Sequence, residues 1–306
     1  MAFSSARLRW LFPWQGAGVM SFFLPLFLLV LPLPAYGEIE VAVSILPQKY
    51  FVEQIGGPKV HVTVMVPPGA NPATYEPRPR QMALLSRASL YFAVGVPFER
   101  TWLKRFEAAN PNMKVVKTQE GIRLYPISER KTRKTSHKSQ ILDPHVWLSP
   151  PLVILQARNI TTALCSSFPG QCNYFLKNFE AFCSKVVDLD VKIMEILSQG
   201  RHNGQGVQRA FLVFHPSWGY FARAYGLRQI AIEQEGKEPK PAQLLKIISV
   251  VKKLGIKVVI LQPQFSPKAA RIVAKETGAM LLVADPLSYN WPQSLLKLAK
   301  WLGKYL

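Results

Sequence analysis

Residues 210–232, AFLVFHPSWGYFARAYGLRQIAI, show how this chain is expected to fold. Ala210–Phe214 is a short apolar run that predicts a strand, and Arg228–Ile232 predicts another. Between them, Ser217–Tyr225 has the pattern of a helix. A strand, a helix and a strand in direct succession favour a βαβ unit with a parallel sheet. His215 stands at the end of the first apolar run.

The same alternation continues along most of the chain. Downstream, the pattern predicts helices at Pro241–Leu254, Pro267–Thr277 and Trp291–Tyr305, and strands at Lys257–Leu261 and Met280–Val283. Upstream, it predicts strands at Glu38–Leu46, Lys59–Val66, Leu90–Val94 and Met113–Val116, and helices at Lys49–Ile55, Arg80–Arg87, Arg100–Ala109 and Pro150–Cys165. Residues 121–142 are polar and aperiodic, so we expect a loop there.

One long helix is predicted between the two alternating halves. Over Asn173–Leu197, apolar residues recur at helical spacing: Phe175, Phe179, Phe182, Val186, Leu189, Ile193 and Ile196. At about 1.5 Å per residue such a helix reaches nearly 40 Å, long enough to run between two domains. We therefore expect an α/β fold of two lobes, each with a mainly parallel sheet flanked by helices, joined by one long interdomain helix. The expected domains are an N-terminal lobe at 38–170, the long helix and linker at 171–203, and a C-terminal lobe at 204–306.

The N-terminus predicts a secretory signal peptide over residues 1–37. Arg7 and Arg9 precede an apolar run, and Ala35-Tyr36-Gly37 is a small-x-small cleavage pattern. Cleavage after Gly37 would place the mature chain in the periplasm or outside the cell. An uncleaved anchor is the alternative. A lipoprotein is not expected, because no cysteine lies near the cut.

The net charge and the cysteines limit the expected partners and the expected disulfides. The formal net charge is +20, and the mature chain keeps 20 − 2 = +18. Nucleic-acid binding is not expected, because no recognition motif accompanies this charge. Cys165 and Cys172 flank a turn-like segment that a disulfide could close, which would leave Cys183 as a buried free thiol.

Three residues near the ends of apolar runs are candidate metal ligands. They are His145 in Asp143-Pro144-His145-Val146-Trp147-Leu148, His215 in Phe214-His215-Pro216, and Asp285 in Ala284-Asp285-Pro286-Leu287. Two imidazoles and one carboxylate with an open fourth position are a known zinc arrangement.

Taken together, these motifs resemble those of the zinc and manganese solute-binding proteins of ABC transporters. The residues that carry the resemblance are 143–150 (DPHVWLSP), 235–239 (EGKEP), 75–77 (YEP), 95–99 (GVPFE), 285–287 (DPL), and Phe214-His215 followed by Tyr220. The resemblance implies a monomeric receptor that captures a divalent metal between two lobes and delivers it to a membrane permease. It maps three of the four usual ligands onto His145, His215 and Asp285, and the histidine at the third ligand position resembles zinc-type members.

The first usual ligand is missing. The family typically has a histidine after proline in a Gly-x-x-Pro-His-x-Tyr-Glu-Pro stretch, and this chain has Ala73 there, between Pro72 and Thr74. Water or Glu76 could complete the tetrahedron, and His137 is a further candidate. Glu233 is interpreted as a residue that orients a histidine rather than as a ligand. Losing one ligand should weaken binding by at least about 10–100-fold.

Zn²⁺ is the expected metal, with Mn²⁺ or another divalent transition metal also possible. Other readings stay open at this point. Ala73 enlarges the expected cleft, so a metal chelate or small anion could bind there. The candidate ligands could be buried residues retained after metal binding was lost. A zinc hydrolase would use Glu76 or Glu233 as its base, but no motif supports an enzyme. An adhesin role could coexist with transport.

Overall fold

The computed structural model describes residues 38–127, 141–199, 209–233 and 237–306. Residues 37–306 form one compact unit. The expected signal peptide and His137 therefore lie outside the described residues. Within the described ranges, no helix is both long and apolar enough to cross a membrane.

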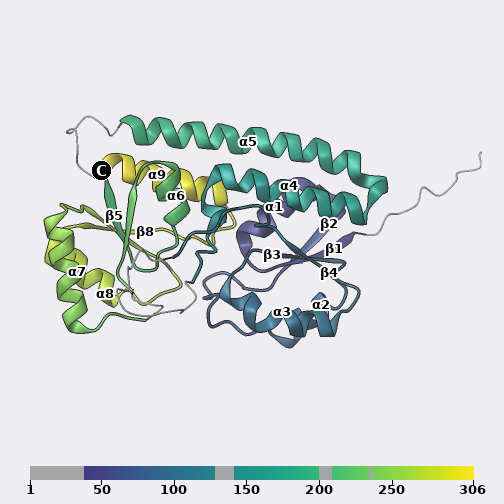
Figure 1. Cartoon of the computed structure of the whole chain (residues 1–306), viewed down its shortest axis with the longest axis horizontal. Helices are drawn as coiled ribbons and strands as arrows, with labels where there is room; N and C mark the ends of the chain where they lie inside the picture. The colour runs from purple at the N-terminus through teal and green to yellow at the C-terminus, as the bar shows by residue number, and fades with distance from the viewer. Residues whose placement is uncertain (1–37, 128–140, 200–208, 234–236) are drawn as a thin grey trace, which may run out of the picture. The chain divides into compact units, whose positions relative to one another are not determined.

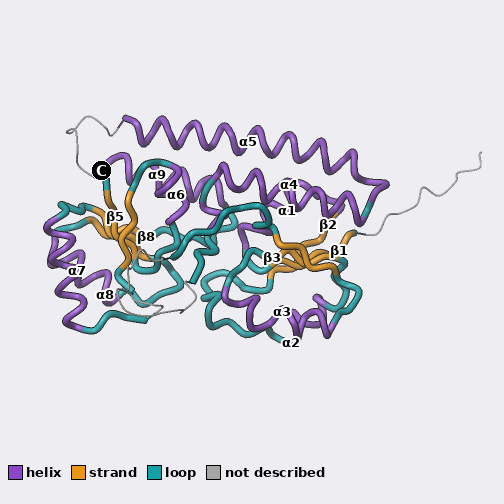
Figure 2. Tube along the Cα trace, in the orientation of Figure 1, coloured by secondary structure: helices purple, strands orange, loops and turns teal. Residues whose placement is uncertain are grey.

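The first sheet is built from the N-terminal half of the unit. Its strands are β1 (Ile39–Val43), β2 (Val60–Val64), β3 (Leu90–Ala93) and β4 (Lys114–Lys117), and all neighbours pair in parallel in the order β2-β1-β3-β4. Figure 2 shows these strands beneath α1 and α4. The strands β1 and β3 are buried on both faces, as expected for the centre of a parallel sheet.

The second sheet repeats this order. Its strands are β5 (Ala210–Val213), β6 (Arg228–Ala231), β7 (Val258–Leu261) and β8 (Met280–Val283), paired in parallel as β6-β5-β7-β8. In each sheet the order reverses between the two central strands. In open parallel sheets, ligands bind at this reversal, beyond the carboxyl ends of the strands.

Helices cover both sheets (Figure 1). Their bounds are α1 Leu46–Gly56, α2 Pro79–Leu85, α3 Pro97–Ala109, α4 Pro150–Ser167, α5 Cys172–Gln199, α6 Gly219–Ala224, α7 Pro241–Lys253, α8 Lys268–Thr277 and α9 Trp291–Tyr305; the short 3₁₀ helices are η1 Gly57–Lys59, η2 Val146–Leu148 and η3 Pro169–Gln171. The first strand is shorter than predicted. It ends at Val43, and the Gln48 side chain accepts the N–H groups of Ser44 and Ile45, so α1 begins at Leu46.

The long helix α5 is present and packs against α1, α4 and α9. It thus touches helices from both halves of the unit, and Figure 1 shows it running above them. Its buried side chains are Phe175, Phe182, Val186, Leu189, Ile193 and Leu197. Two stripe positions differ from the prediction: Phe179 and Ile196 are only half-buried. At the C-terminal end of α5, Leu197 is buried in place of the predicted Ile196.

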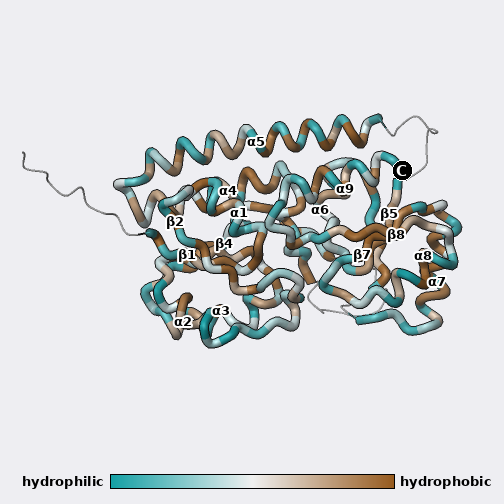
Figure 3. Tube along the Cα trace, turned by 180° about the vertical axis from the view of Figure 1, so that it is seen from behind, coloured by the Kyte–Doolittle hydropathy of each residue, from teal (hydrophilic) through white to brown (hydrophobic). Residues whose placement is uncertain are grey.

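Two layers of helices sandwich the second sheet. Phe211, Val213 and Ile260 face the core that contains α6 and α9. Leu212 and Val259 point to the other side, into the core of α7 and α8. This alternation follows from the twofold side-chain period of a strand. The strands of this sheet are strongly hydrophobic in Figure 3.

A disulfide joins Cys165 at the end of α4 to Cys172 at the start of α5. It closes the segment that holds η3, as the sequence suggested. Cys183 is a free thiol, but it is half-buried rather than buried. The expectation of full burial was wrong because Cys183 lies on the flank of α5, next to its buried stripe.

Candidate metal site

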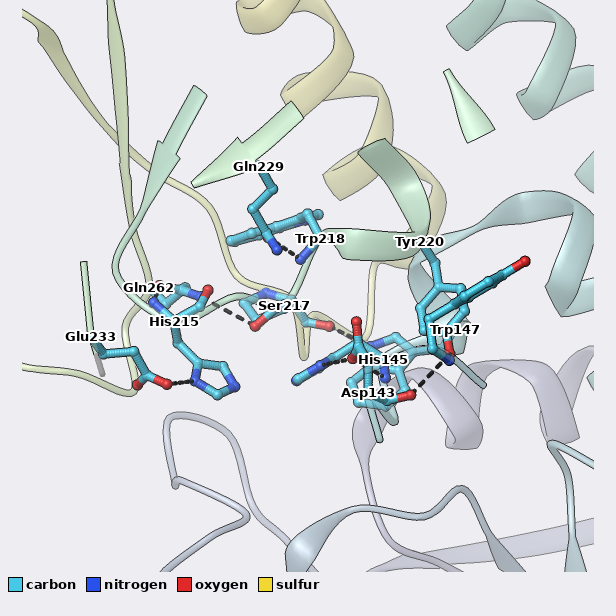
Figure 4. Close-up of polar contacts among 12 residues, drawn as sticks. Asp143, His145, Trp147, His215, Ser217, Trp218, Tyr220, Gln229, Glu233 and Gln262 are labelled. Carbon is cyan, nitrogen blue, oxygen red and sulfur yellow. Dashed lines mark hydrogen bonds and ion pairs between the residues drawn. The ribbon is translucent and has the colours of Figure 1, made fainter. Parts of the chain in front are cut away.

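Two of the three candidate ligands meet. His215 lies just beyond the carboxyl end of β5, and His145 lies in the loop that enters η2. Their ring centroids are 5.2 Å apart and the ring planes are inclined by 68°. Figure 4 shows the two side chains with their polar partners. The two histidines are seventy positions apart in the sequence, and tertiary structure alone brings them together.

His145 is held by Asp143. The Asp143 carboxylate lies 2.6 Å from His145 Nδ1 and also accepts the backbone N–H of His145 at 3.0 Å. A carboxylate only accepts hydrogen bonds, so Nδ1 carries the hydrogen and Nε2 keeps its lone pair. Burial lowers the pKa of His145, and the nearby Asp143 offsets this only in part. The ring therefore favours its neutral form, which is the form that binds metals.

His215 has a similar carboxylate neighbour. Glu233, which follows β6, places Oε1 2.8 Å from His215 Nδ1, an ion-pair distance without a hydrogen bond between the two atoms. The Glu233 side chain is only 6% exposed, whereas that of His215 is 22% exposed. The other face of the His215 ring stacks on Phe265, with centroids 5.0 Å apart. Both neighbours fix the ring so that Nε2 points away from Glu233.

Gln262 anchors the backbone of His215. It follows β7, is fully buried, accepts the N–H of His215 at 2.9 Å and donates to its carbonyl at 2.6 Å. It also contacts Ser217 Oγ at 3.2 Å. The strands β5 and β7 are the central pair of the second sheet, so this contact lies at the reversal of strand order. Sequence reasoning missed Gln262, although it lies at the end of an apolar run as His215 does.

The segment that carries His145 is tied to the C-terminal half of the unit. Tyr220 Oη donates to the carbonyl of Asp143 at 3.1 Å. Trp147 Nε1 donates to the carbonyl of Pro286 at 2.8 Å, and Trp291 Nε1 donates to the carbonyl of Trp147 at 2.7 Å. These three bonds connect the loop before α4 with α6, α9 and the loop after β8. Asp143 also approaches Gly219 so closely that a Cβ there would lie 2.8 Å from Oδ2.

Asp285 lies apart from the histidine pair. Its Oδ1 accepts a hydrogen bond from Gln264 Nε2 at 2.7 Å and one from the N–H of Leu287 at 2.9 Å. Across the described ranges, no three His, Cys, Asp or Glu side chains are grouped closely enough to hold a metal ion. The structure therefore brings His145 and His215 together, and it leaves Asp285 bonded to Gln264 and to the N–H of Leu287.

The segment with the missing histidine is exposed. Ala73 donates its N–H to Asn71 Oδ1 at 2.9 Å, which forms a tight turn. The side chains of Ala73 and Glu76 both face solvent. No contact places Glu76 beside the histidine pair among the residues that the structure describes. Its role as a ligand or as a base therefore stays a prediction.

Comparison with known proteins gives one family. The family model described as "Zinc-uptake complex component A periplasmic" matches residues 41–301. The "High-affinity zinc uptake system protein ZnuA" of Bacillus subtilis (strain 168) is 29% identical over 258 residues, covering 82% of this chain and 79% of that protein. The "Zinc-binding lipoprotein AdcA" of Streptococcus pneumoniae (strain ATCC BAA-255 / R6) is 28% identical, and the match spans 83% of this chain but 51% of AdcA.

Solved structures agree with the fold. The structure described as "Crystal structure of ZnuA" superposes with a TM-score of 0.79 at 38% sequence identity, covering 88% of this chain and 99% of that one. The structure of Zn(II)-bound AdcA from Streptococcus pneumoniae has a TM-score of 0.70 at 26% identity, covering 88% of this chain and 58% of AdcA. The two-lobed architecture with a long helix is therefore shared with these proteins.

Proposed function

Because this chain belongs to the family of periplasmic zinc-uptake components, we propose that it is the metal-binding receptor of an ABC importer and that it captures Zn²⁺. The observation that carries the proposal is the pair His145 and His215, whose rings meet 5.2 Å apart. Each ring has a carboxylate at Nδ1, which leaves Nε2 for the metal. A carboxylate that accepts the Nδ1 hydrogen, as Asp143 does for His145, fixes the ring and raises its basicity toward zinc.

Asp285 is the proposed third ligand. In the structure its Oδ1 is bonded to Gln264 and Leu287, so zinc binding requires a local rearrangement that turns the carboxylate toward the histidines. The loop of Asp285 is already joined to the His145 segment through the bond from Trp147 to Pro286. A small shift within this joined region is therefore the expected closing movement.

Water or Glu76 completes the coordination sphere in place of the missing histidine. Ala73 lies on an exposed turn, so the ligand that a histidine there would supply is replaced by solvent or by the nearby carboxylate. His137 is the remaining alternative. With three protein ligands the site should bind zinc more weakly than a four-ligand site, by at least about 10–100-fold.

Imidazole and carboxylate ligands suit Zn²⁺, and the same set should also accept Cu²⁺ or Ni²⁺. Mn²⁺ is the weaker candidate because two nitrogen ligands favour softer metals. The partner is a membrane permease that receives the metal. The protein acts outside the cytoplasm after cleavage near Gly37, as a monomer, and performs no catalysis.

Competition with a calibrated chelator tests this function directly. Zinc binding is measured for the metal-stripped protein and for His215→Ala, with His61→Ala as the matched control. His61 pairs with Glu40 on the surface of the first sheet. We expect one zinc per wild-type chain, loss of that zinc in His215→Ala, and no change in His61→Ala. Equal zinc binding by wild type and His215→Ala would refute the site.

Ala73→His and Asp285→Asn refine the result. Restoring the histidine should tighten zinc binding by about 10-fold or more, because it adds a ligand to a three-ligand site. Asp285→Asn should weaken binding by a similar factor. If Asp285→Asn binds zinc like the wild type, Asp285 is a structural residue that serves only its bonds to Gln264 and Leu287.

A further inference from the structure

The outer side of α7 and α8 has an unusual charge. Between residues 240 and 278 the chain has seven lysines and one arginine against a single acid, Glu276, a local net charge of 8 − 1 = +7. The cations are Lys240, Lys246, Lys252, Lys253, Lys257, Lys268, Arg271 and Lys275, and all eight are exposed. We call this surface the α7–α8 lysine face. By comparison, α5 over residues 172–199 has three lysines against four acids, a local net charge of 3 − 4 = −1.

Six of the eight cations belong to α7 and α8, which the fold places on one side of the second sheet. The helices α7 and α8 pack against each other on the same face of the second sheet, opposite α6 and α9. Figure 1 shows α7 and α8 side by side in this layer. Their inner sides are buried through Ile247, Val251 and Val273, so the charged sides of both helices point outward together.

Among the residues that the structure describes, the cations of this face form no salt bridge with an acidic side chain. In the described part of the chain, the ion pairs involve other residues, and none includes a cation of this face. Three large hydrophobic side chains lie exposed among the lysines: Leu245 at 68%, Ile272 at 47% and Val250 at 41%. Leu245 has the highest exposure of the large hydrophobic side chains in that part of the chain.

We propose that the α7–α8 lysine face binds the surface of an anionic phospholipid bilayer. Clustered lysines around exposed aliphatic side chains are the pattern by which proteins lie on such surfaces, with the cations at the head groups and the apolar side chains at the acyl boundary. A membrane is also where the permease of the proposed function resides. Docking by this face would hold the receptor near its transporter without any specific protein contact.

The composition of the face favours lipid over other acidic partners. Protein interfaces are enriched in arginine and aromatic residues and depleted in lysine, whereas this face has seven lysines and one arginine. Lysine is a compact point charge that suits mobile head groups, and arginine suits fixed bidentate partners. Single-stranded nucleic acid needs exposed aromatic rings for stacking. The one aromatic residue in this range, Phe265, stacks on Phe214 and His215 instead.

Vesicle co-sedimentation tests the proposal on the chain from Glu38 onward. Residues 37–306 form one compact unit, and the apolar run of the N-terminus would bind lipid by itself. Neutral vesicles consist of phosphatidylcholine alone, and anionic vesicles contain about 30% phosphatidylglycerol in phosphatidylcholine. We expect binding only to the anionic vesicles, and release in high salt because screening shortens the range of the attraction.

Two charge-matched double variants locate the binding surface. Lys246→Glu with Lys253→Glu alters the face, and Lys177→Glu with Lys192→Glu makes the same change in net charge on exposed positions of α5. Each cation near an anionic bilayer contributes about fivefold to binding, so the first double variant should bind at least about 20-fold more weakly. The α5 double variant should stay within about threefold of wild type. Equal thermal stability of all three proteins excludes unfolding as the cause.

Other outcomes decide against the proposal. Equal losses in both double variants would mean that total charge, not this face, governs binding. Binding to neutral vesicles as tight as to anionic ones would also overturn it. So would tighter binding to a single-stranded RNA oligomer than to the anionic vesicles. Leu245→Ser should weaken vesicle binding several-fold while Val187→Ser on α5 does not, which checks the role of the apolar contact.

Discussion

The contact between Gln262 and His215 gives the sharpest prediction for stability. Replacing Gln262 with leucine keeps a side chain of similar size but removes the bonds to the N–H and the carbonyl of His215. Each of these backbone groups then loses its partner next to a fully buried position, at a cost of about 1–3 kcal/mol per group. The extra apolar burial of leucine returns about 1 kcal/mol. The net loss should be about 3 kcal/mol.

Thermal unfolding of the zinc-free protein followed by circular dichroism measures this loss. For a domain of this size, 1 kcal/mol corresponds to about 2–4 °C in Tm, so Gln262→Leu should lower Tm by roughly 6–12 °C. The matched control is Gln293→Leu, at an exposed position of α9, which should change Tm by less than about 2 °C. A similar small change in Gln262→Leu would refute the reasoning, because the two bonds would then contribute nothing.

Two further predictions concern buried carboxylates. Glu233→Gln removes the carboxylate beside His215 Nδ1, so zinc affinity measured by chelator competition should fall by about 10–100-fold. The control Glu238→Gln, at an exposed position nearby, should leave zinc affinity unchanged. Equal zinc affinities of Glu233→Gln and the wild type would show that Glu233 does not act on the metal. Burial raises the pKa of the Glu99 carboxyl group, so Glu99 keeps its proton to higher pH in the folded protein than in the unfolded chain. The Tm of the wild type should therefore fall relative to that of Glu99→Gln as pH rises above about 4.5. The exposed Glu107 on the same helix provides the control, since Glu107→Gln should track the wild type at every pH; parallel curves for Glu99→Gln and the wild type would contradict the assignment.

The pH dependence of Glu99 has a structural cause. Its carboxylate accepts the hydroxyl of Ser44 at 2.5 Å and the N–H groups of Val94 and Gly95 at 2.8 and 2.7 Å. These bonds favour the charged form, but the cost of removing the group from water is larger. The cluster lies at the carboxyl ends of β1 and β3, where the strand order of the first sheet reverses. It is the counterpart in the first sheet of the position that Gln262 and His215 occupy in the second.

Most of the secondary structure followed from local pattern. Among the residues that the structure describes, alternating apolar runs and helical stripes located the strands and α-helices to within a few residues, including the end of α8 at Gly278, which has the left-handed φ of 68°. They did not predict the short 3₁₀ helices. The errors came where a local cap or the packing of helices overrides the hydrophobic pattern. Gln48 ends β1 early by accepting two backbone N–H groups, and the packing of α5 buries Leu197 rather than Ile196.

The candidate site was only partly predictable. His145, His215 and Asp285 stand out because they follow apolar runs in recognisable motifs. The resemblance to the metal-binding family treated the three as one set. The structure joins the two histidines and keeps Asp285 with Gln264. No sequence pattern indicates the bond between Gln264 and Asp285, because it joins the loops after two different strands.

The sequence by itself determined the α/β class and the long helix, and it predicted the candidate metal ligands, because these depend on hydrophobic period and side-chain chemistry along the chain. Only the tertiary structure decided the strand order, the meeting of His145 with His215, and the contact between Glu233 and His215. Those contacts join residues from separate strands and loops. They are set by how the two sheets and their helices bury their apolar faces, which is a property of the whole packed chain rather than of any local stretch.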